Sequence, residues 1–441
     1  MEKFEYYRRS DRPGTQIKKI RKGTFVMFAE KNGKFQIRPA TGAQVKIAIA
    51  GDVCPHKSAE SYLLEGNASK LLAGIKPALE DADLRIVQWE TVISDTPDPI
   101  TKCGPNLIVK PGCESFLTEG KFDIALMANN HTGDHAAAGV LSTMKILKET
   151  GLMTVGAGTD AADAAKPLRF EKNGIKFSLI NICEMEFGTA REDYPGANAM
   201  QEFKVPGQIA EENKVSDFVI VVIHGGNEYN PIPSPRMKNL YRSFAAAGAK
   251  LVMNIHTHCP QGVEVIDGVP IVYCPGNFFF SDEDEFNPAS FWWSGYLPKF
   301  TCDKNGVSEI EITPYVYSPD PWKIEALTGA QRQWYLEYID KISSLIDAEG
   351  DHLYDIWCAY KYKTPLWWVQ NAPAEALLAD IEDADALKKF PPIRHMLTCQ
   401  SHCELTRNVF LLLEQKKMSK MIEELPYLTE LRTARFAEQQ A

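Results

Sequence analysis

Polar side chains that can bind a metal ion or transfer a proton stand at the ends of several predicted strands. Each follows or closes a short run rich in β-branched residues. Because active sites in open α/β sheets gather at the carboxyl ends of strands, we expect these side chains to meet in one crevice. The set comprises Asp52, Glu90, Asn130, His131, His224, His256 and His258.

The donor types in this set point to metal chemistry. Taken singly, an Asp after a strand is more often a turn residue, and a His is more often a hydrogen-bonded structural side chain. Together, the Asp, the Glu, the Asn and three of the four His make the mixed oxygen and imidazole set that holds two Zn, Mn or Fe ions about 3.5–4 Å apart. Asp52 or Glu90 would bridge the two ions. Because such a pair activates a water and clamps phosphoryl oxygens, the set favours phosphoester hydrolysis with one or two divalent transition metals per chain.

Strand-like and helix-like segments alternate from residue 46 onward, which predicts α/β layers. Amphipathic helices are expected at 136–151 and 234–249. From about residue 320 the pattern becomes helical. We therefore expect an N-terminal β-hairpin decoration at 1–45, an α/β domain at 46–320 and a helical region at 321–441. The expected strands are 46–50, 84–90, 122–128, 152–156, 176–182, 217–224, 250–256, 270–274 and 309–317.

The composition is that of a folded protein and narrows the function classes. Of 441 residues, 44% are hydrophobic and 24% charged, which excludes disorder or a coiled coil as the main class. The formal charge of −10 argues against nucleic acid as a partner, and we expect a small phosphorylated or polyanionic substrate instead. The first 25 residues lack a signal-peptide core and no run of 18 apolar residues occurs. We therefore expect no membrane anchor and a cytoplasmic protein with reduced cysteines.

Six short motifs carry a resemblance to a known family. In chain order they read GDVCPH, VQWETVI, ANNHTGD, VIHGGNEY, NIHTHCPQG and PGNFFF, between residues 46 and 282. Their order and spacing resemble the bacterial capsule-synthesis or poly-γ-glutamate-synthesis (CapA) family, a branch of the calcineurin-like metallophosphoesterases. The resemblance implies a four-layer α/β/β/α sandwich, and it leaves the C-terminal helical region outside the matched part.

The resemblance also implies a role for each motif residue. His131 matches the family's non-ligand histidine that faces the substrate, which donates a proton to the leaving oxygen or stabilises transition-state charge. Asp134, three residues further on, is expected to orient His131. The implied metal ligands are Asp52, Glu90 as the bridge, Asn130, His258 at the first ion, and His224 and His256 at the second.

Two positions depart from the wider superfamily. Its first motif is Asp-x-His, whereas here the second member is Cys54. Cys54 could bind the metal as a thiolate, His56 could replace the missing histidine, or Cys54 could be a small buried thiol that binds nothing. Glu90 stands where the wider superfamily usually has Asp. CapA-type sequences share this Glu, and its longer side chain would change how the metals are bridged.

Three further features of the sequence bear on function. Glu228 could touch substrate, although a loop carboxylate is usually only solvated, and Asn277 could line the crevice. The aromatic-rich helical tail could cover the crevice as a lid. The tail also holds His395, Cys399, His402 and Cys403, for which a zinc site is geometrically conceivable. Their spacing matches no standard zinc motif, so ordinary buried side chains of a packed helix are expected there.

These observations leave three functions open. The first is a cytoplasmic, metal-dependent hydrolase of a phosphoester. The second is a component of capsule or poly-γ-glutamate biosynthesis that handles an acidic polymer or its precursor. The third is a non-catalytic binding protein in which the metal supports the fold, an alternative suggested by the missing first-motif histidine.

Overall fold

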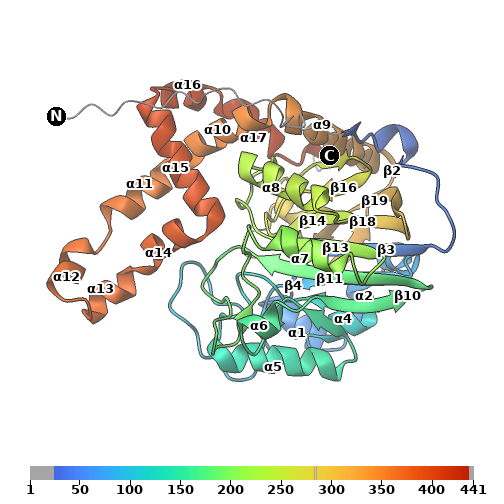
Figure 1. Ribbon diagram of the computed structural model, residues 1–441, viewed down its shortest axis with the longest axis horizontal. Coiled ribbons are helices and arrows are strands. Elements are labelled where there is room, and N and C mark those ends of the chain that lie inside the picture. Colours follow the sequence, from blue (N-terminus) through green and yellow to red (C-terminus); the bar gives the residue numbers. More distant parts are fainter. Residues whose placement is uncertain (1–23, 283, 285, 437–441) are drawn as a thin grey trace.

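Two β-sheets stacked face to face form the centre of the molecule (Figure 1). This computed structural model describes residues 24–282, 284 and 286–436. Most sheet strands lie near the predicted ranges, because runs such as 218–224 are buried on both faces and rich in Val and Ile. The strand at 294–303 was not predicted from the sequence.

The first sheet has nine strands and carries the N-terminal half of the site. Its centre is parallel: β3 pairs with β4, β4 with β7 and β7 with β8. Its strands are β2 (Lys34–Gln36), β19 (Gly306–Ser318), β18 (Ser294–Asp303), β3 (Val45–Cys54), β4 (Leu84–Trp89), β7 (Ile124–Leu126) and β8 (Met153–Val155) in spatial order, with β17 (Phe279–Phe280) beside β3 and β20 (Lys323–Ala326) beside β19.

The second sheet has seven strands and carries the other half of the site. It is parallel from β11 through β13 and β14 to β16, with antiparallel strands at both edges. In spatial order the strands are β1 (Thr24–Phe25), β15 (Val263–Ile266), β16 (Val269–Val272), β14 (Leu251–Ile255), β13 (Phe218–His224), β11 (Ile175–Cys183) and β10 (Leu168–Lys172). Two short two-stranded sheets complete the set: β5 (Val92–Ile93) with β6 (Ile108–Val109), and β9 (Ala157–Gly158) with β12 (Gly196–Ala197).

Three apolar cores separate four layers. The largest lies between the sheets, where Ile49 and Leu126 of one sheet share a cluster with Ile220 and Met253 of the other. The outer face of the nine-stranded sheet is covered by α1 to α5, and that of the seven-stranded sheet by α7 and α8. The expected four-layer α/β/β/α sandwich is therefore confirmed. These helices are α1 (Ser58–Leu64), α2 (Ala68–Leu72), α3 (Lys76–Glu80), α4 (Ser115–Glu119), α5 (Ala136–Glu149), α7 (Val205–Glu212) and α8 (Pro235–Ala246), with α6 (Ala161–Ala164) beside β9 and β12.

The described part of the N-terminal segment does not form the expected hairpin. Strand β1 pairs with β15 in one sheet and β2 pairs with β19 in the other. Between them Phe28 is buried in the core between the sheets, and the Asp340 carboxylate accepts the backbone N–H groups of Phe28 and Ala29 at 2.7 and 2.9 Å. Edge strands of both sheets offer unpaired hydrogen-bonding groups, so the segment spans the sandwich instead of folding on itself. The first 23 residues of the decoration expected at 1–45 lie outside the described residues.

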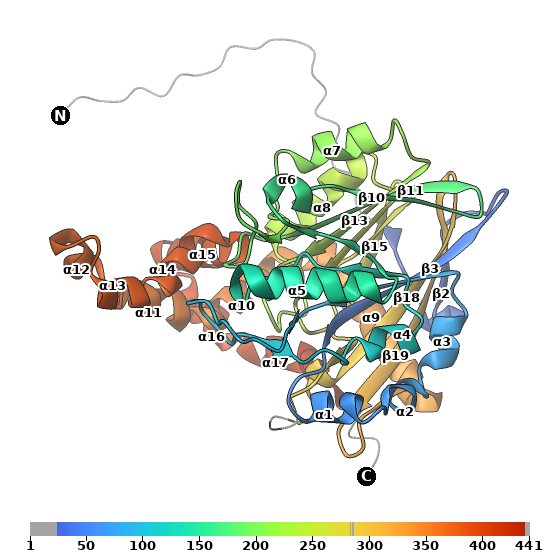
Figure 2. The same cartoon turned by 90° about the horizontal axis from the view of Figure 1, so that it is seen from below.

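The C-terminal region is helical from Gly329, slightly later than expected, because β20 still pairs with β19. Helices α9 and α10 bury Ile339 and Trp357 in the same core that lies between the sheets, so a separate folding unit at 321–441 stays a prediction. Figure 2 shows α11 to α14 extending away from the body. The helices are α9 (Gly329–Ala348), α10 (Gly350–Lys361), α11 (Lys363–Gln370), α12 (Ala374–Ala379), α13 (Ala384–Lys389), α14 (Pro391–Thr398), α15 (Gln400–Glu414), α16 (Met418–Glu423) and α17 (Leu425–Leu431). Within the described ranges, we find no helix with the length and apolarity needed to cross a membrane.

Candidate functional site

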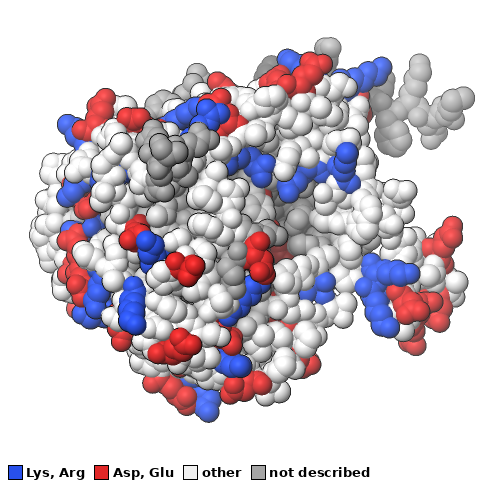
Figure 3. Space-filling view, turned by 180° about the vertical axis from the view of Figure 1, so that it is seen from behind, with Lys and Arg blue, Asp and Glu red and all other residues white. Residues whose placement is uncertain are grey.

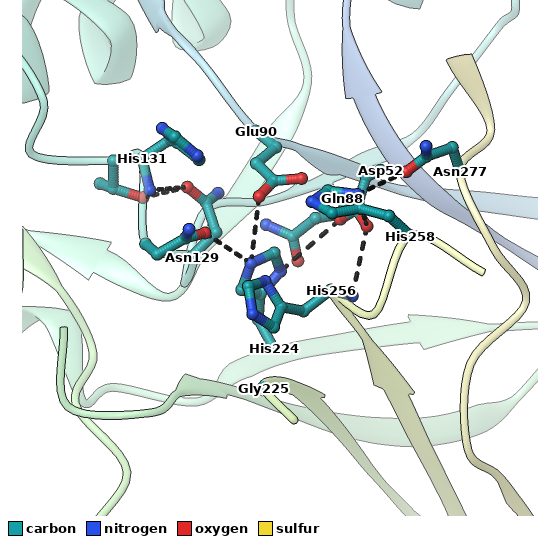
Figure 4. A network of polar contacts seen from close by, with 12 residues as sticks. Asp52, Gln88, Glu90, Asn129, His131, His224, Gly225, His256, His258 and Asn277 are labelled. Atoms are coloured by element: carbon teal, nitrogen blue, oxygen red, sulfur yellow. Dashed lines mark hydrogen bonds and ion pairs between the residues drawn. The ribbon is translucent and has the colours of Figure 1, made fainter. Parts of the chain in front are cut away.

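The carboxyl ends of four parallel strands, two from each sheet, bring the predicted site residues together (Figure 4). Asp52 lies near the end of β3 and Glu90 directly after β4. From the other sheet, His224 is the last residue of β13, and His256 follows β14. All four side chains are buried. These four side chains therefore lie close together, as expected from their positions at the ends of strands.

A β-bulge aims Asp52 into the site. The pairing of β3 with β4 skips one residue between Ala50 and Asp52, and a bulge of this kind redirects the side chain that follows it. The skipped residue is Gly51, where an added Cβ would lie 1.9 Å from the carbonyl oxygen of Gly276. Only glycine permits this approach, which also places Asn277 beside the site.

The loop after β14 has a backbone shape that few side chains adopt. His256 has a φ of 109° and His258 a φ of 52°, both in the left-handed region. Strain of this kind persists where surrounding contacts hold it, often at functional sites. Here the His256 N–H donates to Asp52 Oδ2 at 3.2 Å, and His258 Nδ1 lies 2.7 Å from Asn277 Oδ1. A proton on Nδ1 of His258 would leave the lone pair of Nε2 for a cation.

His224 lies at the centre of the cluster. Its Nε2 is 2.8 Å from Asn130 Oδ1 and 3.3 Å from Glu90 Oε1, and its Nδ1 is 3.6 Å from Asp52 Oδ1. The ring centroid of His256 is 4.6 Å from that of His224. Three sets of side chains therefore have donor atoms all within 4.8 Å of one another: Glu90, His224 and His256; Asp52, Glu90 and His258; and Glu228, His256 and His258.

Several buried donor atoms in this cluster have no hydrogen-bond partner among the residues that the structure describes. They are Asp52 Oδ1, both carboxylate oxygens of Glu90, His224 Nδ1 and His256 Nδ1. A buried carboxylate or imidazole without a partner costs free energy, and a bound cation would remove that cost. The oxygen and nitrogen donors also suit Zn, Mn or Fe. On both counts the residues present fit a divalent transition-metal site.

Burial dominates the electrostatics of the cluster. It raises the pKa of Asp52 well above its usual range, an effect to which the neighbouring Glu90 charge adds, and it raises the pKa of Glu90 similarly. Burial, with the nearby His256, lowers the pKa of His224 far below its usual value. The surroundings thus disfavour the charged forms of all three side chains, because burial outweighs the nearby charges of the opposite sign. A divalent cation would supply a counter-charge.

His131, Asp134 and Lys102 form a second buried cluster beside the first. His131 Nδ1 lies 2.6 Å from Asp134 Oδ2, and Lys102 forms an ion pair with the other carboxylate oxygen. Asp134 also accepts the backbone N–H of Leu107 at 2.7 Å. Burial and the Lys102 charge lower the pKa of His131, so its ring is neutral at neutral pH. Although burial opposes its ionisation, His131 and Lys102 hold the pKa of Asp134 below its usual value. Asp134 touches His131 as expected, whereas nothing in the sequence pointed to Lys102.

Cys54 and His56 both have apolar neighbours. Cys54, a free thiol, packs with Leu107 and Phe280, and burial raises its pKa well above the usual value. The ring of His56 lies edge-on to Phe280. Among the described residues, neither belongs to any of the sets that could share an ion with Asp52. The arrangement favours the view that Cys54 is a buried thiol without a metal.

A cavity of about 270 Å³ opens over the site. Asn130, His131 and His256 line it from the body, and Glu228, whose side chain is exposed, lies at its edge. The opposite wall comes from the C-terminal helices, chiefly Trp357, Lys361, Trp368, His395 and His402. Seen from behind in Figure 3, the surface is hollowed between the body and these helices. The tail therefore covers part of the crevice, although no sequence motif assigned Lys361 or Trp368 to the site.

Comparisons with known proteins agree with the six motifs. The model of the family described as "Bacterial capsule synthesis protein PGA_cap" matches residues 46–282, more than half of the chain. Over 310 residues the chain is 25% identical to PGA biosynthesis protein CapA of Bacillus subtilis (strain 168), covering 68% of this chain and 80% of that protein. Over 280 residues it is 26% identical to capsule biosynthesis protein CapA of Bacillus anthracis, covering 62% and 67%.

The solved structures that resemble this chain do so at low sequence identity. One is the calcineurin-like phosphoesterase YfkN from Bacillus subtilis, which aligns with 69% of this chain and 99% of its own at 11% identity and a TM-score of 0.36. A second, a hypothetical protein from Thermus thermophilus, aligns with 62% of this chain and 99% of its own, at 12% identity and a TM-score of 0.40. The resemblance drawn from the motifs is confirmed by the extent of the family match at residues 46–282. The chain therefore belongs to the bacterial capsule synthesis protein (PGA_cap) family.

Proposed function

We propose that this protein is a metal-dependent hydrolase that acts on a phosphoester. The observation that carries the proposal is the cluster of buried carboxylate and imidazole atoms without hydrogen-bond partners, gathered from both sheets beneath one cavity. A core this polar is costly unless cations occupy it. When bound, two divalent ions would activate a water and polarise the phosphoryl oxygens.

The donor groups would hold two ions, with one carboxylate common to both sets of ligands. Glu90 is common to two of the three-residue groups and is the proposed bridge. The first ion would take Asp52, Glu90 and His258. The second would take Glu90, His224 and His256, together with Asn130, whose Oδ1 lies 2.8 Å from His224 Nε2. Zn, Mn and Fe all suit this oxygen and nitrogen set.

His131 is the proposed catalytic residue that contacts the leaving oxygen, because it lines the cavity beside Asn130. A phosphoryl group in the cavity adds negative charge, which favours the protonated imidazole and so the transfer of a proton to the leaving group. Asp134 acts through His131 and is a positioning residue. Lys361 on the opposite wall would attract a phosphorylated or polyanionic substrate.

Metal content is the first test. Protein purified without chelators or added metal should hold at least two divalent transition-metal ions per chain, and an Asp52→Ala, His224→Ala double variant should hold about two fewer. Next, His131→Gln should keep the metal but lose turnover of a generic phosphoester such as p-nitrophenyl phosphate by about 100-fold or more. Full turnover by metal-free protein, or by His131→Gln, would refute the proposal.

A second candidate is a role in capsule or poly-γ-glutamate biosynthesis. The names of the two CapA relatives favour it, and an acidic polymer would suit the polyanionic-substrate expectation. Phosphoester hydrolysis and a biosynthetic role are compatible, whereas a purely binding role is not compatible with turnover. Thermal protection by vanadate that requires added metal would support an anion site at the metals, and protection without metal would favour the binding protein. The cytoplasmic location expected from the sequence belongs to the first proposal, the hydrolase.

A further inference from the structure

A second cluster of potential metal ligands lies on the far wall of the cavity, where the C-terminal helices meet the body. Glu186 comes from the loop after β11, His395 from α14, Cys399 from the junction of α14 with α15, and His402 from the first turn of α15. One donor atom from each of the four lies within 4.8 Å of those of the other three. His395 Nε2 is 2.7 Å from the Glu186 carboxylate.

The local backbone explains why these side chains converge. Helix α14 ends at Thr398, and Cys399 adopts an extended conformation, with φ −72° and ψ 126°, before α15 begins. This break brings the His395 and His402 rings to a centroid separation of 4.1 Å. The sequence had grouped Cys403 with them, but Cys403 is exposed and Glu186, 209 residues before His395, takes its place.

The donor set is chemically suited to zinc. Two imidazoles, one thiol and one carboxylate are four ligands of the types that Zn²⁺ accepts in tetrahedral sites. Cys399 and Glu186 are buried, at 2% and 7% exposure. In the described part of the chain, His402 Nδ1 is a buried atom without a hydrogen-bond partner, which is the pattern expected of a side chain that binds an ion.

A metal-free explanation has to account for the same contacts. The Cys399 thiol lies 3.3 Å from Glu184 Oε2, but that glutamate already forms an ion pair with Arg236. The 2.7 Å contact between Glu186 and His395 would be an ordinary ion pair. Neither contact gives a partner to His402 Nδ1. Neither explains why a thiol and two imidazoles have donor atoms within 4.8 Å of one another.

We propose that Glu186, His395, Cys399 and His402 bind one zinc ion that fastens helices α14 and α15 to the body over the cavity. Glu186, His395 and His402 also line that cavity, so the same ion would fix its outer wall. The ion would be structural and distinct from the proposed pair at Glu90, with which it shares no ligand. The inference therefore holds whether or not the protein hydrolyses a phosphoester.

Cobalt substitution separates this site from the other by its sulfur ligand. Co²⁺ bound to a thiolate shows a charge-transfer band in the near ultraviolet that oxygen and nitrogen ligands do not give. Co²⁺-loaded wild-type protein should show this band, and Cys399→Ser should lose it. Cys403→Ser, a matched control one turn away, and Cys54→Ser, which tests the first-motif sulfur two residues from Asp52, should both keep it.

Zinc content gives an independent measurement. Cys399→Ser and His402→Gln should each hold about one zinc ion per chain fewer than wild type, and the Asp52→Ala, His224→Ala variant should still hold about one. His402→Gln replaces a partly exposed ring and serves if Cys399→Ser does not fold. A wild-type protein without the band, a band lost in Cys54→Ser but kept in Cys399→Ser, or a zinc content unchanged in His402→Gln would overturn the proposal.

Discussion

Replacing Asp134 with Asn tests the coupling between fold stability and the proposed proton donor. The Asp134 carboxylate is fully buried, and it faces three groups: the Lys102 ammonium, His131 Nδ1 at 2.6 Å and the Leu107 N–H at 2.7 Å. An Asn side chain has one acceptor oxygen and a donor amide. The amide would face another donor, and the Lys102 side chain, 4% exposed, would lose its counter-ion.

The size of the effect follows from that unpaired charge. Leaving one partner of a buried ion pair without the other costs about 3–5 kcal/mol. An unfolding entropy of about 2.1 cal/mol/K per residue gives about 0.9 kcal/mol/K for 441 residues, so Asp134→Asn should lower Tm by about 3–5 °C. The rate should fall as well, by about 100-fold or more in kcat, because His131 loses the carboxylate that orients it.

A double variant separates the two effects. Lys102→Met with Asp134→Asn removes both charges, so Tm should return to within about 1–2 °C of wild type. kcat should stay low, with KM and metal content little changed, because His131 is still not oriented. Differential scanning calorimetry and steady-state kinetics on the three proteins make the comparison. An Asp134→Asn protein that melts at the wild-type temperature, or a double variant that melts below the single one, would refute the reasoning.

Other contacts give three more predictions. Gly51→Ala should destabilise the fold and lower metal content, because the added Cβ would lie 1.9 Å from a carbonyl oxygen. Gly207→Ala serves as the control, since a Cβ added there meets no heavy atom within 4 Å. For each ion bound at 100 times its Kd, chelation should lower the wild-type Tm by about 3 °C, the equivalent of about 2.7 kcal/mol. The decrease should be smaller in Asp52→Ala, His224→Ala. Although burial opposes its ionisation, the pKa of Asp303 is held below the usual value by Arg38 and two backbone N–H donors. Its contribution to stability is present above about pH 4 and is lost as pH falls, so Asp303→Asn should flatten the acid limb of a Tm against pH curve.

The sequence could predict the part of the site that depends on strand ends. Runs such as 218–224 are so apolar that their strand character is clear, and His224 is the first polar residue at the end of that run. Parallel strands direct their carboxyl ends to one edge, so the meeting of Asp52 with His224 follows from topology. The Asp134 contact with His131 was also predictable, because the two residues lie three positions apart in one tight loop.

Other contacts depend on distances that no local pattern encodes. The N-terminal segment joins both sheets because their edges lie at one end of the sandwich, which is a property of the finished fold. Lys102 reaches Asp134 across a 32-residue separation, and Glu186 reaches His395 across more than 200. Cys54 has the right position in its motif for a ligand, but its neighbours Leu107 and Phe280 give it an apolar surrounding that only tertiary packing reveals.

The two clusters of donors are best understood through the cavity that they share. On the body side, parallel strands hold Glu90 and His224 in a rigid frame, as metal-dependent chemistry requires. On the other side, His395 belongs to the eight-residue helix α14, and His402 to the first turn of α15, whose Leu405 and Val409 pack in the core between the sheets. Because Glu186 belongs to the body and His402 to the tail, an ion bound between them would fix the width of the cavity, and through it the size of the substrate that reaches His131.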